Sequence, residues 1–326
     1  MNLLRRLLLM GLLATGAGLA RAGDPPPTPA DSTDEPSADE MYEQGKSLFD
    51  QYAPHEVKDQ IEFPNKEEWD KFAARLQQAL DNNDLRALAV YEPQARAALV
   101  ALRTLPGYED YADWLQERLD YIQAAKQTTQ LPPPRPPPLR PPVKPGEKAQ
   151  PSLFVPYYDL WVQRMRARAT PANADSLMPA LRAAFAKEGV PPEIAWLAEA
   201  ESTLNPSARS PAGAKGLFQF TPDTAKGLGL STFLPDDRTD PEKSARAAGR
   251  YLRELYAKFG EWPLAFAAYN AGEGRVARLL KVRGASTFAG IASALPSETR
   301  MYVPKVCATI AVRAGVPPEK LPPPRA

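Results

Sequence analysis

Proline is the residue that most constrains this chain. There are 37 prolines among 326 residues, gathered in a few tracts, against a usual share of about 5 %. Proline removes an amide donor and clashes with the preceding helical turn, so a helix cannot run through such a tract. One helical domain from end to end is therefore excluded, and the tracts are expected to separate folded modules.

The proline tracts divide the chain into parts with different expected behaviour. Residues 23–40 are rich in Pro, Ser and Asp and are expected to be disordered, because they contain too few apolar residues to offset their ordering entropy. Residues 128–151 favour polyproline II and are expected to hold their neighbours apart as a spacer. The expected parts are 1–22 (signal peptide), 23–40 (disordered), 41–127 (helical module), 128–151 (linker), 152–317 (second folded domain) and 318–326 (tail).

The N-terminus has the pattern of an export signal. Arg5 and Arg6 precede the apolar run 7–20, and Ala20-Arg21-Ala22 has the small-x-small pattern of a cleavage site. A helix over that run covers about 21 Å, short of the ~30 Å hydrocarbon core, which disfavours an uncleaved anchor. We expect cleavage after Ala22, no lipid-bearing cysteine beside it, and an exported protein that lies outside the cytoplasm.

The counts of cysteine and histidine exclude several kinds of chemistry. Cys307 and His55 are the only residues of their types, so an intramolecular disulfide, a cysteine-based zinc site and a multi-histidine metal site are ruled out. No metal or organic cofactor is expected. Residues 24–126 are acidic and residues 127–326 basic, but no basic cluster interleaved with aromatic residues indicates nucleic-acid binding.

Residues 41–127 have the pattern of a small helical module. Asn65, with Glu68 three residues later, predicts a capping box at a helix start. Two apolar stripes at helical spacing follow: Trp69, Phe72, Ala73, Leu76 and Leu80, then Tyr111, Trp114, Leu115, Leu119 and Ile122. No residues of catalytic type gather here, so substrate binding, partner docking and spacing all remain open as roles.

The strongest catalytic candidate is Glu201, in a helix expected from Pro192 to just before Pro206. On a helical wheel it shares a face with Ile194, Leu197, Ala198 and Leu204. Glu199 points about 160° away on that wheel and is expected to be solvated. A carboxylate among aliphatic groups has a raised pKa and can donate a proton near neutral pH. The alternative is that Glu201 pairs with a core arginine or caps a neighbouring helix.

Further breaks and caps outline the region around this helix. Residues 207–219 form a small-residue turn that lets backbone approach a ligand closely. Asp240 as N-cap and Pro241 open a packing helix, and Pro263 begins a shorter one. Ser297 is expected to cap the last helix.

Three ordered blocks carry a family resemblance: ESTLNPSARSPAGAKGLFQFTPDTA from Glu201, AAYNAGEGRV from Ala267 and LPSETRMYVPKV from Leu295. Together they resemble the catalytic domain of lytic transglycosylases in the goose-type lysozyme superfamily, most closely the D-type membrane-bound members. The resemblance implies a mainly α, lysozyme-like catalytic domain over residues 152–317. It does not extend to the separate small helical N-terminal module, which is expected from the residue pattern alone.

The resemblance also implies a periplasmic protein that contacts the cell wall peripherally, a substrate and a mechanism. Glu201 would protonate the bond between N-acetylmuramic acid and N-acetylglucosamine in peptidoglycan, then act as base while the muramic C6 hydroxyl closes on C1 to give a 1,6-anhydro end. The implied substrate-binding residues are Ser210 and Gln219 on the acetamido group, Phe218 beside the sugar, Tyr269 orienting Glu201, Asn270 supporting the cleft and Glu298 bracing its floor.

Other interpretations of these residues remain open. A goose-type hydrolase would share the glutamate but admit water and leave a reducing end, and a wall-binding scaffold would have no activity. Tyr269 can equally be a core aromatic with a satisfied hydroxyl. Asn270 and Glu298 can equally serve as helix-terminating or capping residues.

Overall fold

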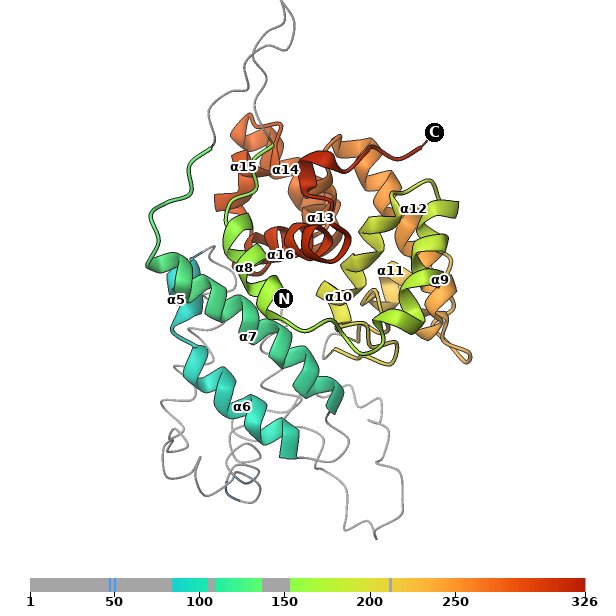
Figure 1. Ribbon diagram of the computed structural model, residues 1–326, viewed down its shortest axis with the longest axis horizontal. Helices are drawn as coiled ribbons and strands as arrows, with labels where there is room; N and C mark the ends of the chain where they lie inside the picture. The colour runs from blue at the N-terminus through green and yellow to red at the C-terminus, as the bar shows by residue number, and fades with distance from the viewer. Residues whose placement is uncertain are drawn as a thin grey trace, which may run out of the picture.

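The computed structural model describes residues 84–104, 109–136, 153–210 and 213–325, together with Ser47 and Asp50. The expected signal peptide, the acidic segment 23–40, the capping box at Asn65 and most of the proline spacer lie outside these residues. The described residues are helical (Figure 1), and their only β-pairing is the isolated bridges of Lys215 with Arg209 and Phe220. The predicted mainly helical class is confirmed.

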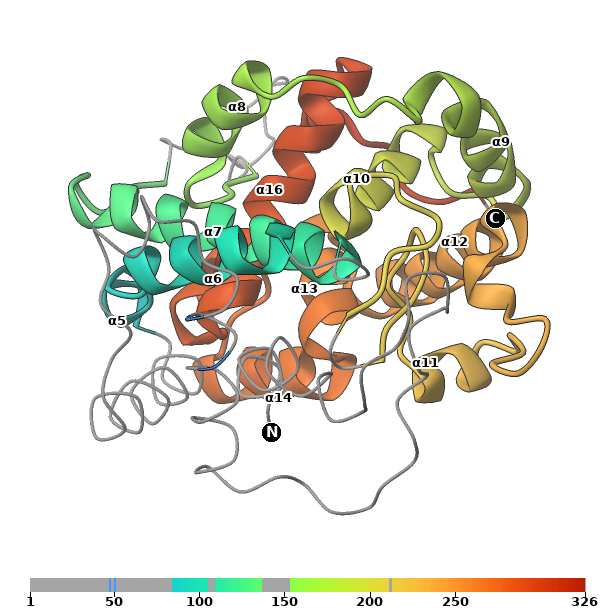
Figure 2. The ribbon, with the colours of Figure 1, turned by 90° about the horizontal axis from the view of Figure 1, so that it is seen from below.

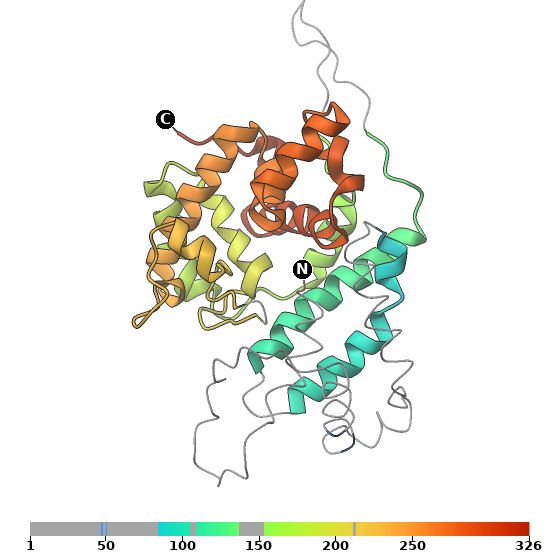
Figure 3. The same cartoon turned by 180° about the vertical axis from the view of Figure 1, so that it is seen from behind.

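Three helices precede the proline tract: α5 (Leu85–Ala89), α6 (Glu92–Thr104) and α7 (Glu109–Thr129). Both α5 and α6 pack on α7, and Figures 1 and 3 show α6 and α7 side by side. The second predicted stripe is confirmed at Leu115, Leu119 and Ile122, which are buried. The first predicted stripe, from Trp69 to Leu80, lies outside the described residues. The side chains of Tyr111 and Trp114 lie outside the described part of the chain.

The other elements follow the proline tract. They are α8 (Tyr158–Ala167), α9 (Ala174–Lys187), the 3₁₀ turn η1 (Pro192–Trp196), α10 (Leu197–Ser202), α11 (Pro222–Gly227), η2 (Asp237–Thr239), α12 (Pro241–Phe259), α13 (Trp262–Ala271), α14 (Glu273–Arg283), α15 (Phe288–Ile291), η3 (Ala292–Ala294), α16 (Ser297–Ala314) and η4 (Pro318–Lys320).

Helix α16 is the central element of this part. It packs against α8, α10, α13 and α7, and Figure 2 shows it passing between α8 and α10. Its residues from Met301 to Ile310 are all buried, because helices surround it on several sides. Helices that are far apart in the sequence therefore meet along α16.

Helix α7 packs against the same core as the elements after the proline tract. Its residues Tyr121, Ile122, Ala124 and Ala125 belong to one continuous apolar core with residues of α8, α10 and α16. The expectation that the spacer holds the two sides apart is therefore wrong for α7. The extended length of a linker sets only the largest separation it allows, whereas the apolar face of α7 gains by burial against α16.

Two helix caps were expected after the proline tract, and one of the two expectations is confirmed. Asp240 caps α12 as predicted, its Oδ1 accepting from the Lys243 amide at 2.9 Å. The expectation of Ser297 as a cap is wrong, since Pro296 takes the N-cap position. Ser297 is instead the first helical residue, and its fully buried Oγ has no hydrogen-bond partner among the residues that the structure describes. No helix among the described residues is both long and apolar enough to cross a membrane.

Candidate active site

Glu201 lies on a short, tightly packed helix. The helix predicted from Pro192 begins as the 3₁₀ turn η1, continues as α10 and ends at Ser202, where Thr203 turns into the left-handed region at φ 53°. The four aliphatic residues predicted on the face of Glu201, namely Ile194, Leu197, Ala198 and Leu204, are all fully buried. The wheel therefore identifies the apolar surroundings of Glu201 correctly.

Glu199 contradicts the expectation of a solvated side chain. It is 0 % exposed, and Arg313 on α16 donates to both of its carboxylate oxygens, at 2.9 Å from Nε and 2.8 Å from Nη2. The helical wheel correctly places Glu199 on the side of the helix away from Glu201. It cannot show that α16 packs over that side of α10 and buries Glu199. The core arginine considered as a partner for Glu201 pairs with Glu199 instead.

The carboxyl group of Glu201 is partly buried and bound by a tyrosine. Tyr302 on α16 donates from Oη to Oε1 of Glu201 at 2.5 Å. Burial raises the pKa of Glu201 to about 7, against the lowering effects of the Tyr302 hydrogen bond and of Arg118 and Lys305; the charge of Glu298 adds to the rise. A group with such a pKa can both donate and accept a proton near neutral pH.

The expectation that Tyr269 orients Glu201 is wrong. Its hydroxyl donates to the backbone carbonyl of Phe218 at 2.8 Å, so the residue that orients Glu201 is Tyr302. Sequence reasoning missed Tyr302, although it stands one helical turn after Glu298 in the block from Leu295. Burial raises the pKa of both tyrosines well above 10, so both hydroxyls stay protonated and can donate.

The loop after α10 uses its polar side chains to hold its own shape. The amide of Ala214 donates to Oγ of Ser210 at 3.1 Å, and the amide of Ser210 donates to the Ala214 carbonyl at 2.9 Å. Gln219 has a positive φ of 48° and donates from Nε2 to the carbonyls of Gly216 at 2.9 Å and Ala208 at 3.3 Å. Ser210 is nearly buried, whereas the side chain of Gln219 remains partly exposed.

Phe218 is a core residue. Its ring is 0 % exposed and lies 5.7 Å from the ring of Phe185 and 6.4 Å from that of Phe220. The expected contact of this ring with a sugar is therefore wrong. Phe218 contributes instead through its backbone carbonyl, which holds Tyr269.

Asn270 and Glu298 connect helices around the site. The hydroxyl of Thr299 donates to Oδ1 of Asn270 at 2.7 Å and joins α16 to α13. Glu298 accepts a hydrogen bond from Nη2 of Arg118 on α7 at 3.1 Å, with both side chains partly exposed. Helix α16 therefore carries both Glu298 and Tyr302, the residue that contacts Glu201. Tyr269 contacts the loop after α10, which carries Phe218 and Gln219.

A buried ionic cluster lies next to the site and has no counterpart in the sequence analysis. Lys305 is 0 % exposed, binds Glu117 and lies 4.8 Å from the ring centre of Tyr121 and 5.7 Å from that of Trp161. Arg168 also binds Glu117. Burial alone would raise the pKa of Glu117, but the charges of Lys305 and Arg168 hold that pKa below its usual range.

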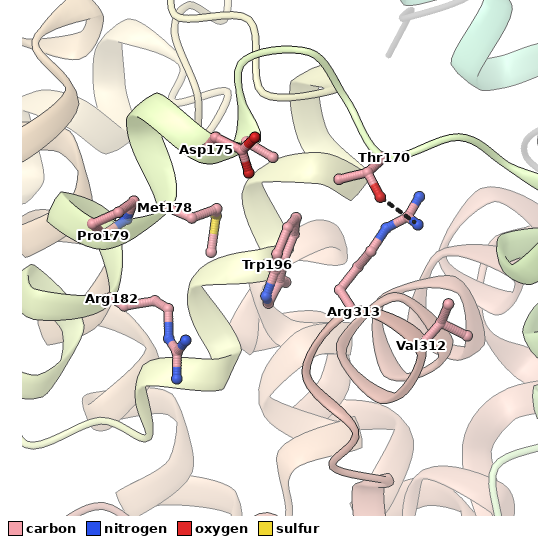
Figure 4. Close-up of a pocket in the computed structure, with 9 residues that line it drawn as sticks. Thr170, Asp175, Met178, Pro179, Arg182, Trp196, Val312 and Arg313 are labelled. Atoms are coloured by element: carbon pink, nitrogen blue, oxygen red, sulfur yellow. Dashed lines mark hydrogen bonds between the residues drawn. The ribbon is translucent and has the colours of Figure 1, made fainter.

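A separate cavity of about 480 Å³ lies on the Glu199 side of α10. Figure 4 shows Trp196 between Met178 and Arg313 in this cavity. Arg313 is already engaged there by Glu199 and by Thr170, whose Oγ1 lies 3.2 Å from Nη1. Among the described residues, no group of three or more His, Cys, Asp and Glu is arranged to hold a metal ion.

Part of this helical domain is similar to transglycosylases of the SLT type. Residues 178–290, which include Glu201, match the family model described as Transglycosylase SLT domain. The chain is similar to membrane-bound lytic murein transglycosylase D of Escherichia coli K12, with 41 % identity over 128 residues, covering 37 % of this chain and 28 % of that protein.

Two other relatives and one solved structure add to this comparison. Membrane-bound lytic murein transglycosylase F of Alcanivorax borkumensis is 42 % identical over 100 residues, 28 % of this chain and 20 % of that protein. The soluble lytic murein transglycosylase of Salmonella typhimurium is 38 % identical over 120 residues, which cover 34 % of this chain and 19 % of that protein. The chain thus spans less than a third of the length of these relatives. The structure of soluble lytic transglycosylase SLT70 from Escherichia coli aligns at 19 % identity with a TM-score of 0.39, over 87 % of this chain and 58 % of that one.

Proposed function

We propose that this protein is a peptidoglycan lytic transglycosylase that cleaves the β1,4 bond between N-acetylmuramic acid and N-acetylglucosamine and leaves a 1,6-anhydro end. The observation that carries the proposal is the carboxyl group of Glu201, whose pKa is raised to about 7 and whose Oε1 is bound by Tyr302. It lies within the residues that match the SLT domain.

In the first step Glu201 acts as a general acid. Because Tyr302 donates to Oε1, the carboxyl proton is best placed on Oε2. This proton passes to the glycosidic oxygen as the bond from that oxygen to C1 of the muramic residue breaks, and the bonding electron pair leaves with the oxygen. The acetamido group of the substrate stabilises the positive charge that develops at C1, so the reaction requires no second carboxylate from the protein.

In the second step the same residue acts as a general base. The Glu201 carboxylate accepts the proton of the C6 hydroxyl while O6 bonds to C1, which closes the anhydro ring and restores the protonated enzyme. The Tyr302 hydroxyl and the positive charges of Arg118 and Lys305 stabilise the carboxylate between the two steps. A pKa near 7 suits a group that must play both roles.

We assign substrate binding to the loop after α10 and to the end of α13. Gln219 is partly exposed at the end of this loop, and Ser210 shapes its turn. We propose that Gln219 and Ser210 hydrogen-bond the acetamido group and neighbouring substituents. Asn270 would keep α13 and α16 in register beside the substrate through Thr299.

The products released from purified peptidoglycan sacculi test this function. A lytic transglycosylase releases anhydro fragments, each lighter by one water than the fragment a hydrolase releases, and mass spectrometry separates the two. A wall-binding scaffold binds sacculi and releases nothing. Glu201→Gln should retain binding and lose release; release by this variant within tenfold of the parent would refute the role of Glu201.

The substrate requires the protein to reach the cell wall. We propose that residues 1–22 act as a signal peptide removed after Ala22, which places the mature protein in the periplasm. N-terminal sequencing of the protein recovered from a periplasmic fraction tests this directly. A first residue other than Gly23 would contradict the proposed cleavage site.

A further inference from the structure

Helix α7 reaches the candidate active site from outside the residues that match the SLT family model. It ends at Thr129, before the proline tract, whereas the SLT match begins at residue 178. Its residue Arg118 nevertheless binds Glu298 on α16, with Nη2 3.1 Å from Oε1. The two side chains are 14 % and 22 % exposed, so this ion pair lies at the edge of the core rather than in open solvent.

Glu298 stands one helical turn before the residue that binds Glu201. Residues four apart on a helix lie on the same face, so Glu298 and Tyr302 are neighbours along α16. Tyr302 then contacts Oε1 of Glu201 at 2.5 Å. Two short contacts, joined by one turn of α16, therefore connect Arg118 to Glu201.

The residue next to Arg118 fixes α7 on the other side of Tyr302. Glu117 binds the buried Lys305, three residues after Tyr302 on α16. It also accepts a hydrogen bond at 2.9 Å from Oγ1 of Thr203, two residues after Glu201. Arg118 and Glu117 of α7 thus bind residues of α16 before and after Tyr302. Glu117 also contacts the end of the helix that carries Glu201.

We propose that Arg118 is a positioning residue of the active site, where its ion pair with Glu298 holds the α16 turn that presents Tyr302 to Glu201. The helix before the proline tract then completes the site rather than serving as a separate module. This inference rests on the proposed function for its effect on turnover, but its effect on Glu201 can be measured without substrate.

The charges around Glu201 give this role a measurable signature. The ionisable groups that act on Glu201 come from α7, α13 and α16: Arg118, Tyr121, Tyr269, Glu298, Tyr302 and Lys305. Arg118 lowers the pKa of Glu201 and Glu298 raises it. Replacing Arg118 by glutamine removes the first effect and leaves the second uncompensated, so the pKa of Glu201 should rise.

The experiment compares Arg118→Gln, Arg118→Lys and Arg164→Gln in the full chain. Arg164 on α8 binds Asp120 of α7 at 3.4 Å, so its replacement weakens the docking of α7 without touching Glu298. The pKa of Glu201 is read by NMR titration of ¹³C-labelled glutamate carboxyls, with Glu201→Gln identifying the signal. The pH profile of fragment release from peptidoglycan is recorded in parallel.

We expect Arg118→Gln to raise the pKa of Glu201 by roughly half a unit to one unit, with the alkaline limb of the pH profile moving equally and turnover falling about tenfold. Arg118→Lys should bring the pKa of Glu201 and the turnover most of the way back to the parent values. Arg164→Gln should leave the pKa and the turnover unchanged. An unshifted pKa in Arg118→Gln, or an equal shift in Arg164→Gln, overturns the inference. A shifted pKa in a protein that releases no fragments supports the positioning role and refutes the proposed function alone.

Discussion

Tyr302 and Glu201, 101 residues apart in the sequence, are joined by a hydrogen bond of 2.5 Å from Oη to Oε1. The bond couples the short helix α10 to the central helix α16. It occupies one carboxyl oxygen, so in the proposed reaction the transferred proton is carried by the other. The proposed proton transfer therefore depends on how α16 is held.

Removing the Tyr302 hydroxyl should change both the rate and its pH dependence. In Tyr302→Phe the hydrogen bond that lowers the pKa of Glu201 is lost, so this pKa should rise above about 7. The first step needs protonated Glu201, so the alkaline limb of kcat/KM should move to higher pH. Loss of orientation should reduce kcat about 10- to 100-fold, in line with a hydrogen bond to a charged group.

The matched control for this prediction is Tyr269→Phe. It removes the hydroxyl that binds the Phe218 carbonyl and leaves the Glu201 contact in place. Its alkaline limb should coincide with that of the parent. Equal displacement of the limb in both variants would show that Tyr302 has no special relationship to Glu201.

The helical periodicity around Glu201 was enough to predict its apolar surroundings, since Leu197 and Leu204 lie within a few residues of it. Helical periodicity could not predict the burial of Glu199. A helical wheel shows which residues share a face, but Arg313, which covers Glu199, comes from 114 residues further along the chain. Burial of a charged side chain depends on a partner that only the tertiary fold brings near.

The same reason explains why Tyr302 and Arg118 were missed. The helical spacing of Tyr302 after Glu298 was visible in the sequence, yet nothing local indicated which of the two faces Glu201. Arg118 stands before a proline tract that favoured the expectation of a detached module. The pairing of Glu117 with Lys305, separated by 188 positions, is the contact that contradicts this expectation.

The buried carboxyl of Glu201 should cost stability at alkaline pH. Its folded pKa of about 7 is raised above the unfolded value of 4.5 by burial. The corresponding stability is fully present below pH 4.5 and is lost as the pH rises through 7. Glu201→Gln has no such loss, so at pH 8 it should unfold with a free energy roughly 1–3 kcal/mol higher than the parent.

Urea unfolding at pH 4.5 and pH 8 measures this difference. The stability gain of Glu201→Gln should shrink towards zero at the lower pH, while fragment release stays about 100-fold or more below that of the parent at both values. A variant that is less stable than the parent at pH 8 would show that the carboxyl is well solvated.

Glu261 should show the same stability effect without any effect on turnover. Burial raises its pKa to about 7, while one carboxylate oxygen accepts the Phe288 amide at 3.1 Å. Glutamine keeps an acceptor for that amide and removes the ionisation. Glu261→Gln should therefore be roughly 1–3 kcal/mol more stable than the parent at pH 8 and about equal at pH 4.5. Fragment release should remain at the parent rate; a shift in its pH profile would indicate that Glu261 acts on the site.

The buried pair of Glu117 and Lys305 should be strongly coupled. Glu117→Gln leaves the fully buried Lys305 without its counter-charge and should cost about 3–5 kcal/mol of unfolding free energy. The double variant Glu117→Leu with Lys305→Met replaces both charges by apolar groups and should recover most of that loss. Urea unfolding of Glu117→Leu, of Lys305→Met and of the double variant gives the coupling. Additive losses would contradict a direct interaction.

Gly216 tests whether the loop that carries Gln219 depends on close backbone packing. A Cβ at this position would lie 1.8 Å from the backbone carbonyl oxygen of Arg238, and Gly216 also has φ +77°. Gly229 has nearly the same φ, +76°, but no atom lies within 4 Å of its Cβ position. The two alanine variants therefore share the conformational cost and differ in the overlap.

Gly229→Ala should lower the unfolding free energy by about 1 kcal/mol, the cost of a left-handed alanine. Gly216→Ala should lose roughly 3 kcal/mol or more, because the backbone of η2 must move away. That movement should displace the Gly216 carbonyl to which Gln219 donates, and so raise KM for peptidoglycan in Gly216→Ala alone. Thermal unfolding and fragment-release kinetics measure the two effects. Equal losses in the two variants would mean that the loop adjusts freely, and that the close approach to Arg238 does not hold Gln219 in place.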